Sequence, residues 1–181
     1  RVIRLADREN VVLVPFDNLV GEENAGWDCA KFLLTHERSG MAGVGYSHAA
    51  LHRLKRAAAT LVRNGRPLLA DRDFTARLAR VEIALQNMET TNLRLLWAAA
   101  KGAAPGVESS MLKIQGTEIR QQINALMLRA MGPHAPLFAN DMTDAAGLDL
   151  AGIGPEPAAR AAVTWFNNRK LSIFGGSNEI Q

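Results

Sequence analysis

The segment RKLSIFGGSNEIQ, residues 169–181, places two adjacent glycines and short polar side chains directly after an apolar run. Such a glycine pair allows φ > 0 and lets another group approach the backbone closely. Ser177 or Asn178 can cap a helix whose first turn carries Glu179. A helix start exposes backbone N–H groups, which suit an anionic or electron-rich ligand. The simpler alternative is an ordinary turn between helices, because short capping patterns often arise by chance.

A second group that could do chemistry is His36-Glu37-Arg38, which follows the apolar residues Phe32–Leu34. Successive helical positions point in directions about 100° apart, so the three side chains cannot all face one site. At most one or two of them are therefore functional, and a solvated polar helix face with ordinary ion pairs has the same pattern. The residues alone leave both interpretations open.

His48 and His52 lie one helical turn apart, a spacing that zinc sites use, but no third ligand accompanies them. The single cysteine, Cys29, excludes an internal disulfide and a metal site with paired cysteine ligands, and it suits a reducing cytoplasm. The formal charge of +3 comes from dispersed residues, which does not favour nucleic-acid binding. No apolar run reaches the length of a membrane span, and the first ten residues lack the core of a signal peptide. We therefore expect a cytoplasmic protein without a metal.

Hydrophobic periodicity predicts one strand followed by helices. The β-branched run in residues 10–15 predicts a short strand, which either pairs with strands outside this chain or lies unpaired on the helices. Apolar residues at intervals of three and four then predict four helices, at about 27–64, 71–102, 109–131 and 157–174. Helices joined mostly by short loops should stack as an antiparallel bundle.

Individual helix positions carry further expectations. In the third helix the stripe comprises Leu112, Ile119, Ile123, Leu126 and Ala130, with Ser109 or Ser110 as its cap. Gly116 on the same stripe would let a neighbouring helix come close, at a cost of about 1 kcal/mol relative to alanine. Glu118, Gln121 and Gln122 are candidates for polar contacts at a helix interface.

Three segments together resemble a known family. VPFDNLVGEENAGWDCAKFLLTHERSGMAGVG, SSMLKIQGTEIRQQ and WFNNRKLSIFGGSNEIQ resemble, in the same order and at similar separations, the C-terminal half of the acyl-CoA dehydrogenases. The resemblance implies an all-α antiparallel four-helix bundle over residues 25–181. It also implies that residues 1–24 are the last strand and linker of a middle β domain, most of which lies outside this chain. In this family FAD sits between that β domain and the bundle.

The resemblance also implies a reaction, the α,β-dehydrogenation of an acyl-CoA thioester. A carboxylate removes the α-proton, a hydride passes from the β-carbon to FAD, and hydrogen bonds to the thioester oxygen stabilise the developing charge. Many relatives hold this glutamate directly before the Gly-Thr of the last motif, where this chain has Gly175. Other relatives hold it on the first bundle helix before an arginine, which matches Glu37 before Arg38.

Glu37 is thus the expected catalytic base, and Arg38 the residue expected to position the CoA portion. Gly176, Ser177 and Glu179 match the segment that contacts FAD. The family further implies homo- or hetero-oligomers formed through the bundle and an electron-transfer flavoprotein as redox partner.

Two segments depart from the family pattern. Many relatives have Arg-Lys-x-Phe-Gly at the end of the first helix, where this chain has LVRNGRP, and Gln-x-x-Gly-Gly after the third helix, where it has LRAMGPHA with Leu128 and Gly132. In those relatives both segments lie on the side that contacts the flavin dinucleotide of a neighbouring subunit. A partner-dependent or scaffolding subunit of a heteromeric dehydrogenase with little activity of its own is therefore the alternative function. An acyl-CoA oxidase, and a self-associating helical bundle that is inactive as this chain alone, also remain open.

Overall fold

The computed structural model describes residues 2–6, 11–40, 42–103, 106–135, 155 and 157–181, without the side chains of residues 2–12, 34–39 and 159. The chain forms two compact units, Arg1–His36 and Glu37–Gln181. Among the described residues, no helix is both long enough and apolar enough to cross a membrane.

The first unit contains a β-hairpin. Strands β1 (Val2–Ala6) and β2 (Val11–Pro15) pair antiparallel, with Val2 opposite Pro15 and Ala6 opposite Val11. The expectation that the strand at residues 10–15 has no partner within this chain was therefore wrong, because the β-branched segment at the N-terminus supplies one. A short 3₁₀ helix (Phe16–Asn18) follows, and α1 (Gly26–Gly40) then begins.

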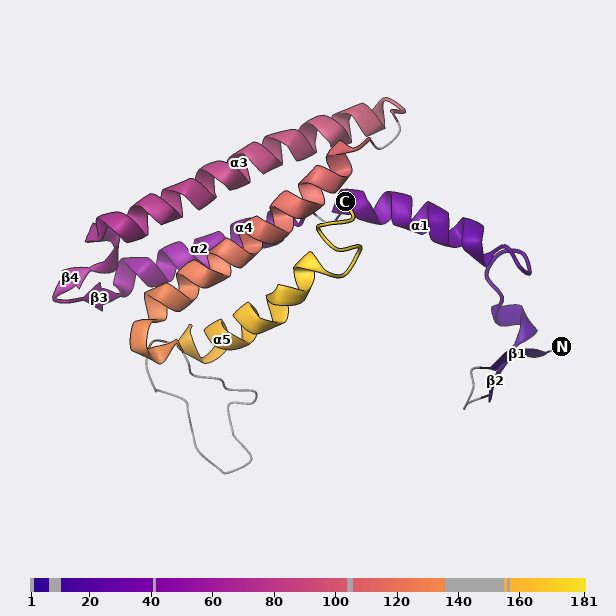
Figure 1. Cartoon of the computed structure of the whole chain (residues 1–181), viewed down its shortest axis with the longest axis horizontal. Helices are drawn as coiled ribbons and strands as arrows, with labels where there is room; N and C mark the ends of the chain where they lie inside the picture. Colours follow the sequence, from indigo (N-terminus) through magenta and orange to yellow (C-terminus); the bar gives the residue numbers. More distant parts are fainter. Residues whose placement is uncertain (1, 7–10, 41, 104–105, 136–154, 156) are drawn as a thin grey trace. The chain divides into compact units, whose positions relative to one another are not determined.

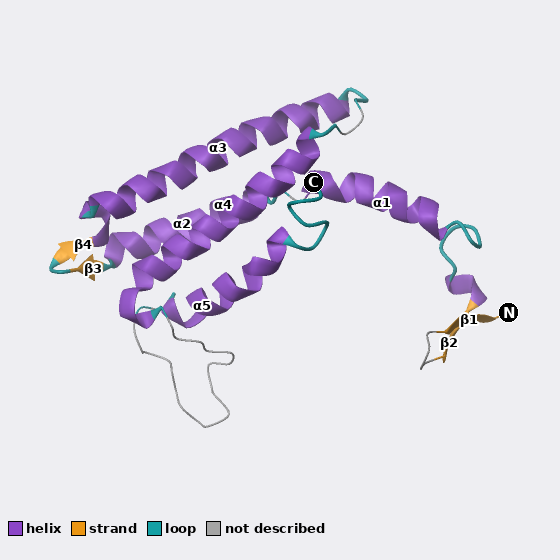
Figure 2. Ribbon diagram, in the orientation of Figure 1, coloured by secondary structure: helices purple, strands orange, loops and turns teal. Residues whose placement is uncertain are grey.

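The second unit is the predicted helical bundle, formed by α2 (Val44–Thr60), α3 (Arg72–Ala100), α4 (Glu108–Met131) and α5 (Ala158–Asn167). Helix α4 is central, because α2, α3 and α5 all pack against it, as Figure 1 shows. A 3₁₀ helix (Asn168–Ser172) continues α5 and also contacts α4. Figure 2 shows that helices dominate this unit and that the only strands described in it form one small hairpin beside α2.

The first predicted helix, residues 27–64, is two helices in the structure, and the second of them ends before residue 64. The structure divides it at residues 41–43, where Gly43 has a left-handed φ of 58°, so α1 and α2 are separate helices. Helix α2 ends at Thr60, and a hairpin of β3 (Val62–Arg63) and β4 (Arg66–Pro67) turns at Asn64 and Gly65, both with positive φ. Hydrophobic spacing continues through both interruptions, which is why periodicity alone merged the segments.

The core consists of the predicted apolar stripes. Helix α3 buries all five residues of its stripe, and its N-cap Asp71 accepts hydrogen bonds from the backbone amides of Asp73 and Phe74 at 2.9 and 3.1 Å. The predicted serine cap of α4 was wrong: Val107 precedes the helix without a side-chain cap, and the Ser109 hydroxyl donates to the Gly106 carbonyl. The principal buried apolar residues of the unit are Leu51, Leu54, Ala58, Phe74, Leu78, Val81, Leu85, Met88, Leu112, Ile119, Ile123, Leu126 and Ala130.

Candidate functional site

The terminal loop, residues 173–181, is fastened to α4 by a buried lysine. Lys113 is fully buried, and its ammonium group donates to the Gly176 carbonyl oxygen at 2.6 Å and to Asn178 Oδ1 at 2.8 Å. A buried ammonium group must have acceptors of this kind, because its desolvation is otherwise very unfavourable. The lysine therefore fixes the glycine loop at one position along α4.

Two further polar contacts hold the same region. One turn along α4, the Thr117 hydroxyl lies 3.3 Å from Asn178 Nδ2. Another turn along, Gln121 Nε2 donates to Ser172 Oγ at 2.7 Å and to the Asn168 carbonyl at 3.3 Å. The predicted role of Gln121 at a helix interface is thus confirmed, whereas Glu118 and Gln122 are exposed.

The two glycines of the loop have backbone conformations that other residues rarely adopt. Gly175 has φ of 72° and Gly176 has φ of 91°. A Cβ at Gly176 would lie 2.3 Å from Gln181 Nε2, a side chain that donates to the Gly175 carbonyl at 3.1 Å. The described chain has turns at 177–180 instead of the predicted capped helix, and Ile180 N donates to the Ser177 carbonyl.

The hydrogen bonds to the Gly175 and Gly176 carbonyls also fix the direction in which the N–H groups of Gly176 and Ser177 point. Every peptide bond described is trans, and in a trans peptide the C=O and N–H groups point in opposite directions. Because the Gly176 carbonyl faces Lys113, the N–H of Ser177 points away from Lys113. By the same reasoning the N–H of Gly176 points away from Gln181. The loop thus presents two backbone donors on small residues, which suit an electron-rich group.

The pKa values of Lys113 on α4 and Glu179 in the loop are both lowered, for different reasons. Burial lowers the pKa of Lys113, and the charge of Glu179 partly offsets this effect. A hydrogen bond from its own backbone amide, followed by one from the Ser177 side chain, lowers the pKa of Glu179, and the charge of Lys113 lowers it further. Glu179 is therefore a carboxylate at neutral pH.

The turn between α1 and α2 is held against the same face of α4. A Cβ at Gly116 would lie 2.3 Å from the Ala42 carbonyl oxygen, so the predicted close approach is present, but the approaching backbone is a turn and not a helix. Arg120 Nη2 donates to the Gly43 carbonyl at 3.1 Å, and its guanidinium lies 5.1 Å from the centre of the Tyr46 ring. A side chain at Gly43 would meet this guanidinium at 2.1 Å. Glycines at 43 and 116 thus permit the contact.

Helix α4 therefore contacts both the terminal loop and the turn between α1 and α2. Residues 113, 116, 117, 120 and 121 recur at the three- and four-residue spacing of one helix face. This face holds the terminal loop with Gly176 and Ser177, and also Ala42 and Gly43 of the turn that follows α1. Glu37 and Arg38 lie in the helical backbone of α1, but their side chains lie outside the described residues.

The histidine pair has a structural partner. His48 Nε2 lies 3.0 Å from Glu89 Oε2 on α3, so this side chain links two helices. Within the part of the chain that the structure describes, no three potential metal ligands come together.

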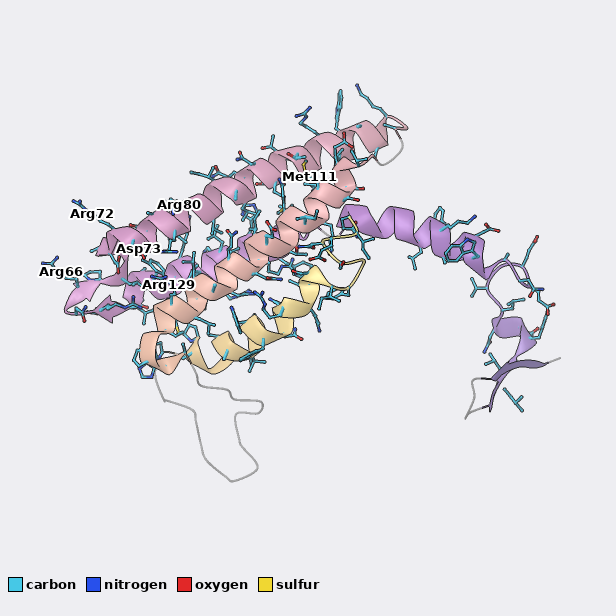
Figure 3. All side chains as sticks on the ribbon, viewed as in Figure 1. Arg66, Arg72, Asp73, Arg80, Met111 and Arg129 are labelled. Carbon is cyan, nitrogen blue, oxygen red and sulfur yellow. The ribbon has the colours of Figure 1, made fainter. Side chains whose placement is uncertain are left out.

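Both segments that depart from the family pattern line one cavity of about 350 Å³, between the β3–β4 hairpin and the end of α4. Two arginines at this end, Arg63 and Arg129, form contacts within the chain. Arg63 donates to the Arg129 carbonyl, and Arg129 Nη2 donates to Asp73 Oδ2 at 2.9 Å. Figure 3 shows Asp73 and Arg129 between the start of α3 and the end of α4.

Comparison with known proteins decides the family. The family model described as the C-terminal domain of acyl-CoA dehydrogenase matches residues 24–181. The chain belongs to the acyl-CoA dehydrogenase family. Acyl-CoA dehydrogenase FadE26 of Mycobacterium tuberculosis is 30% identical over 174 residues, which cover 94% of this chain and 41% of FadE26. The chain therefore spans about two fifths of the length of this relative.

Solved acyl-CoA dehydrogenase structures share the fold. Butyryl-CoA dehydrogenase from Megasphaera elsdenii matches with a TM-score of 0.65 and 20% identity, over 93% of this chain and 39% of that chain. Acyl-CoA dehydrogenase from Geobacillus kaustophilus matches with a TM-score of 0.70 and 20% identity, over 94% of this chain and 40% of that chain. The helical arrangement is thus that of the family's C-terminal domain, as predicted.

The sequence analysis missed two residues that organise this part of the acyl-CoA dehydrogenase fold. Lys113 and Arg120 are cations on or beside the predicted apolar stripe of α4, one turn on either side of Gly116. A cation at a core-facing helical position is unusual unless it is paired, so this placement was a usable signal. Its partners could not be found from spacing, because Gly176 lies 63 residues from Lys113 and Gly43 lies 77 residues from Arg120.

Proposed function

We propose that the protein carrying this chain performs the FAD-dependent α,β-dehydrogenation of an acyl-CoA thioester, with this chain supplying the C-terminal helical domain. The observation that carries the proposal is the family match over residues 24–181. Residues 1–24 are proposed to belong to the preceding β domain and residues 25–181 to the helical domain.

The proposed catalytic base is Glu37. A glutamate at position 175, where many relatives hold the base, would have to adopt the φ of 72° that Gly175 has here, a conformation unfavourable for residues with a Cβ. The nearby Glu179 does not suit the role, because its pKa is lowered whereas a general base acts best with a pKa near the working pH. Arg38 is proposed to position the CoA portion, since a guanidinium binds phosphate oxygens with paired hydrogen bonds.

The terminal loop fits the edge of a flavin. Gly176 has no side chain to obstruct a planar ring, and the N–H groups of Gly176 and Ser177 point away from their buried partners. We propose that Gly176, Ser177 and Glu179 hold FAD, which when bound supplies the acceptor for the hydride. Lys113 would act on this contact indirectly, by fixing the Gly176 carbonyl on the opposite side of the loop.

Because the proposed base, Glu37, lies on α1 and position 175 of the loop is a glycine, the acyl pocket should also have a different shape. Removing a side chain at position 175 leaves space, so bulky, branched, dicarboxylic or ring-attached acyl groups are the proposed substrate class. An electron-transfer flavoprotein is the proposed electron acceptor, and oligomers are proposed to form through the bundle.

A second candidate is a subunit that depends on a different partner chain for its flavin contacts. It is favoured by the cavity beside the β3–β4 hairpin, because its lining residue Arg63 binds the Arg129 carbonyl and the neighbouring Arg129 side chain binds Asp73. A dinucleotide phosphate placed there would have to compete with the Arg129 carbonyl and Asp73 for these donors.

The deciding experiment is anaerobic mixing of the full-length protein, with FAD bound, against a panel of acyl-CoA thioesters while the oxidised flavin absorbance is followed. We expect some thioesters to bleach the flavin rapidly and Glu37→Gln to slow bleaching by a factor of about 10² to 10⁴ with unchanged flavin content. Normal bleaching in Glu37→Gln would exclude this residue as the base. If no thioester bleached the flavin, or if flavin bound only after a second subunit was added, the partner-dependent function would replace the first.

A further inference from the structure

A second cleft lies further along the same face of α4, where α2 and α5 both pack on this helix. The cleft measures about 850 Å³, within the range of small-molecule sites. Its walls and floor include Arg53 and Arg56 of α2, Asn124 and Met127 of α4, and Arg160 and Thr164 of α5. We call it the arginine cleft. Asn124 lies eleven residues beyond Lys113, about 16 Å along the helix, so the cleft is separate from the terminal loop.

The polar groups of the arginine cleft are mainly cationic donors. Arg53, Arg56 and Arg160 line it together, and no aspartate or glutamate is among its described lining residues. Across the described ranges, none of these three guanidinium groups forms an ion pair. Three like charges around one hollow repel one another, and a bound anion would remove that repulsion. Guanidinium groups also match the geometry of phosphate and carboxylate oxygens.

A buried donor at the floor points to the same kind of ligand. Asn124 is only 7% exposed, and its Nδ2 has no hydrogen-bond partner among the residues that the structure describes. Buried polar groups are nearly always hydrogen-bonded, so an unpaired amide donor facing a cleft calls for an acceptor from outside. Beside it, Ile123, Met127 and Ala161 provide an apolar surface. The ligand therefore needs both anionic oxygens and an apolar portion.

We propose that the arginine cleft is a second binding site, for a small organic phosphate whose anionic oxygens meet Arg53, Arg56, Arg160 and the Asn124 amide. This inference does not depend on the dehydrogenase reaction, because the cleft shares no residue with the terminal loop or with α1. Ligand occupancy would bridge α2 and α5 across α4, and so stabilise the bundle on the side away from α3.

The test is titration calorimetry on the full-length protein with FAD already bound, using inorganic pyrophosphate as the anionic probe and ADP as a probe with an added organic portion. We expect saturable binding of one ADP per chain, and weaker binding of pyrophosphate. Arg56→Gln and Arg160→Gln should each weaken ADP binding at least tenfold. The control Arg72→Gln removes an exposed arginine at the start of α3, labelled in Figure 3, and should leave binding unchanged.

A further variant, Asn124→Leu, tests the amide at the floor of the arginine cleft independently of the arginines in its walls. It removes the buried donor while keeping the side-chain volume similar, so ADP binding should weaken while flavin content stays constant. Absence of saturable binding, equal weakening by Arg72→Gln, or release of FAD in proportion to bound ADP would each overturn the proposal. Binding seen only after Asp141, Asp144, Asp149 and Glu156 are changed to amides would also overturn it. In that case carboxylates of the chain itself, which lie outside the described residues, would be the natural partners of the arginines.

Discussion

The ammonium group of Lys113 lies 2.6 Å from the carbonyl oxygen of Gly176, so a fully buried charge on α4 determines where the terminal loop lies. The same ammonium group binds Asn178 Oδ1 at 2.8 Å. One residue of the helix core thus joins the bundle to the glycine loop proposed to hold FAD. This contact makes the loop's position a property of helix packing, and the first prediction tests that dependence.

Lys113→Met should loosen the terminal loop. Methionine has a similar length but leaves the Gly176 carbonyl and Asn178 without their donor, which should cost about 1–3 kcal/mol of unfolding free energy. We expect faster amide hydrogen exchange in residues 172–181 and reduced flavin retention. The control Lys170→Met changes an exposed lysine of the adjoining 3₁₀ helix and should have little effect. Unchanged exchange in the Lys113 variant would show that the loop holds its position without the lysine.

Gly116→Ala should destabilise the bundle although alanine favours helices. The new Cβ would lie 2.3 Å from the Ala42 carbonyl oxygen, a backbone atom that cannot move without shifting the α1–α2 turn. Overpacking of this kind costs about 1–3 kcal/mol, which exceeds the gain of about 1 kcal/mol in helix propensity. The matched control is Gly45→Ala in α2, where a Cβ meets nothing within 4 Å. We expect opposite shifts of the urea midpoint, and a stabilised Gly116 variant would contradict the close contact.

The Asp73 carboxylate should contribute stability that depends on pH. Hydrogen bonds from Arg77, with the charges of Arg77, Arg129 and Arg80, lower the pKa of Asp73 below its ordinary value of 3.8. A lowered folded-state pKa means that the stabilisation is present above pH 3.8 and is lost as the pH falls through the folded-state pKa. Figure 3 shows Asp73, Arg80 and Arg129 at the end of the bundle where α3 begins.

The corresponding measurement compares urea midpoints of the wild type and Asp73→Asn between pH 7 and pH 3. The wild type should be the more stable at pH 7, and the difference should shrink toward the acid end. Asp17→Asn, in the other structural unit, provides a control for unrelated charge changes. A difference that stayed constant with pH would mean that the ion pairs of Asp73 contribute nothing measurable.

Much of the bundle could be predicted from residue types and spacing. The stripe Phe74, Leu78, Val81, Leu85 and Met88 is buried as predicted, because helical periodicity is a local property of the sequence. The ordered motifs also indicated the acyl-CoA dehydrogenase family, which the match over residues 24–181 confirms. The roles of Glu37, Arg38, Ser177 and Glu179 remain predictions.

Only the tertiary structure decided how α4 organises the candidate site. The pairing of β1 with β2, the break between α1 and α2, and the partners of Lys113 and Arg120 depend on contacts between segments that the sequence separates. A buried lysine is stable only where acceptors from another segment meet it, and a glycine is required only where another backbone approaches. Hydrophobic spacing gives the face of a helix that is buried, whereas the segment packed against each residue of that face follows from the folded chain.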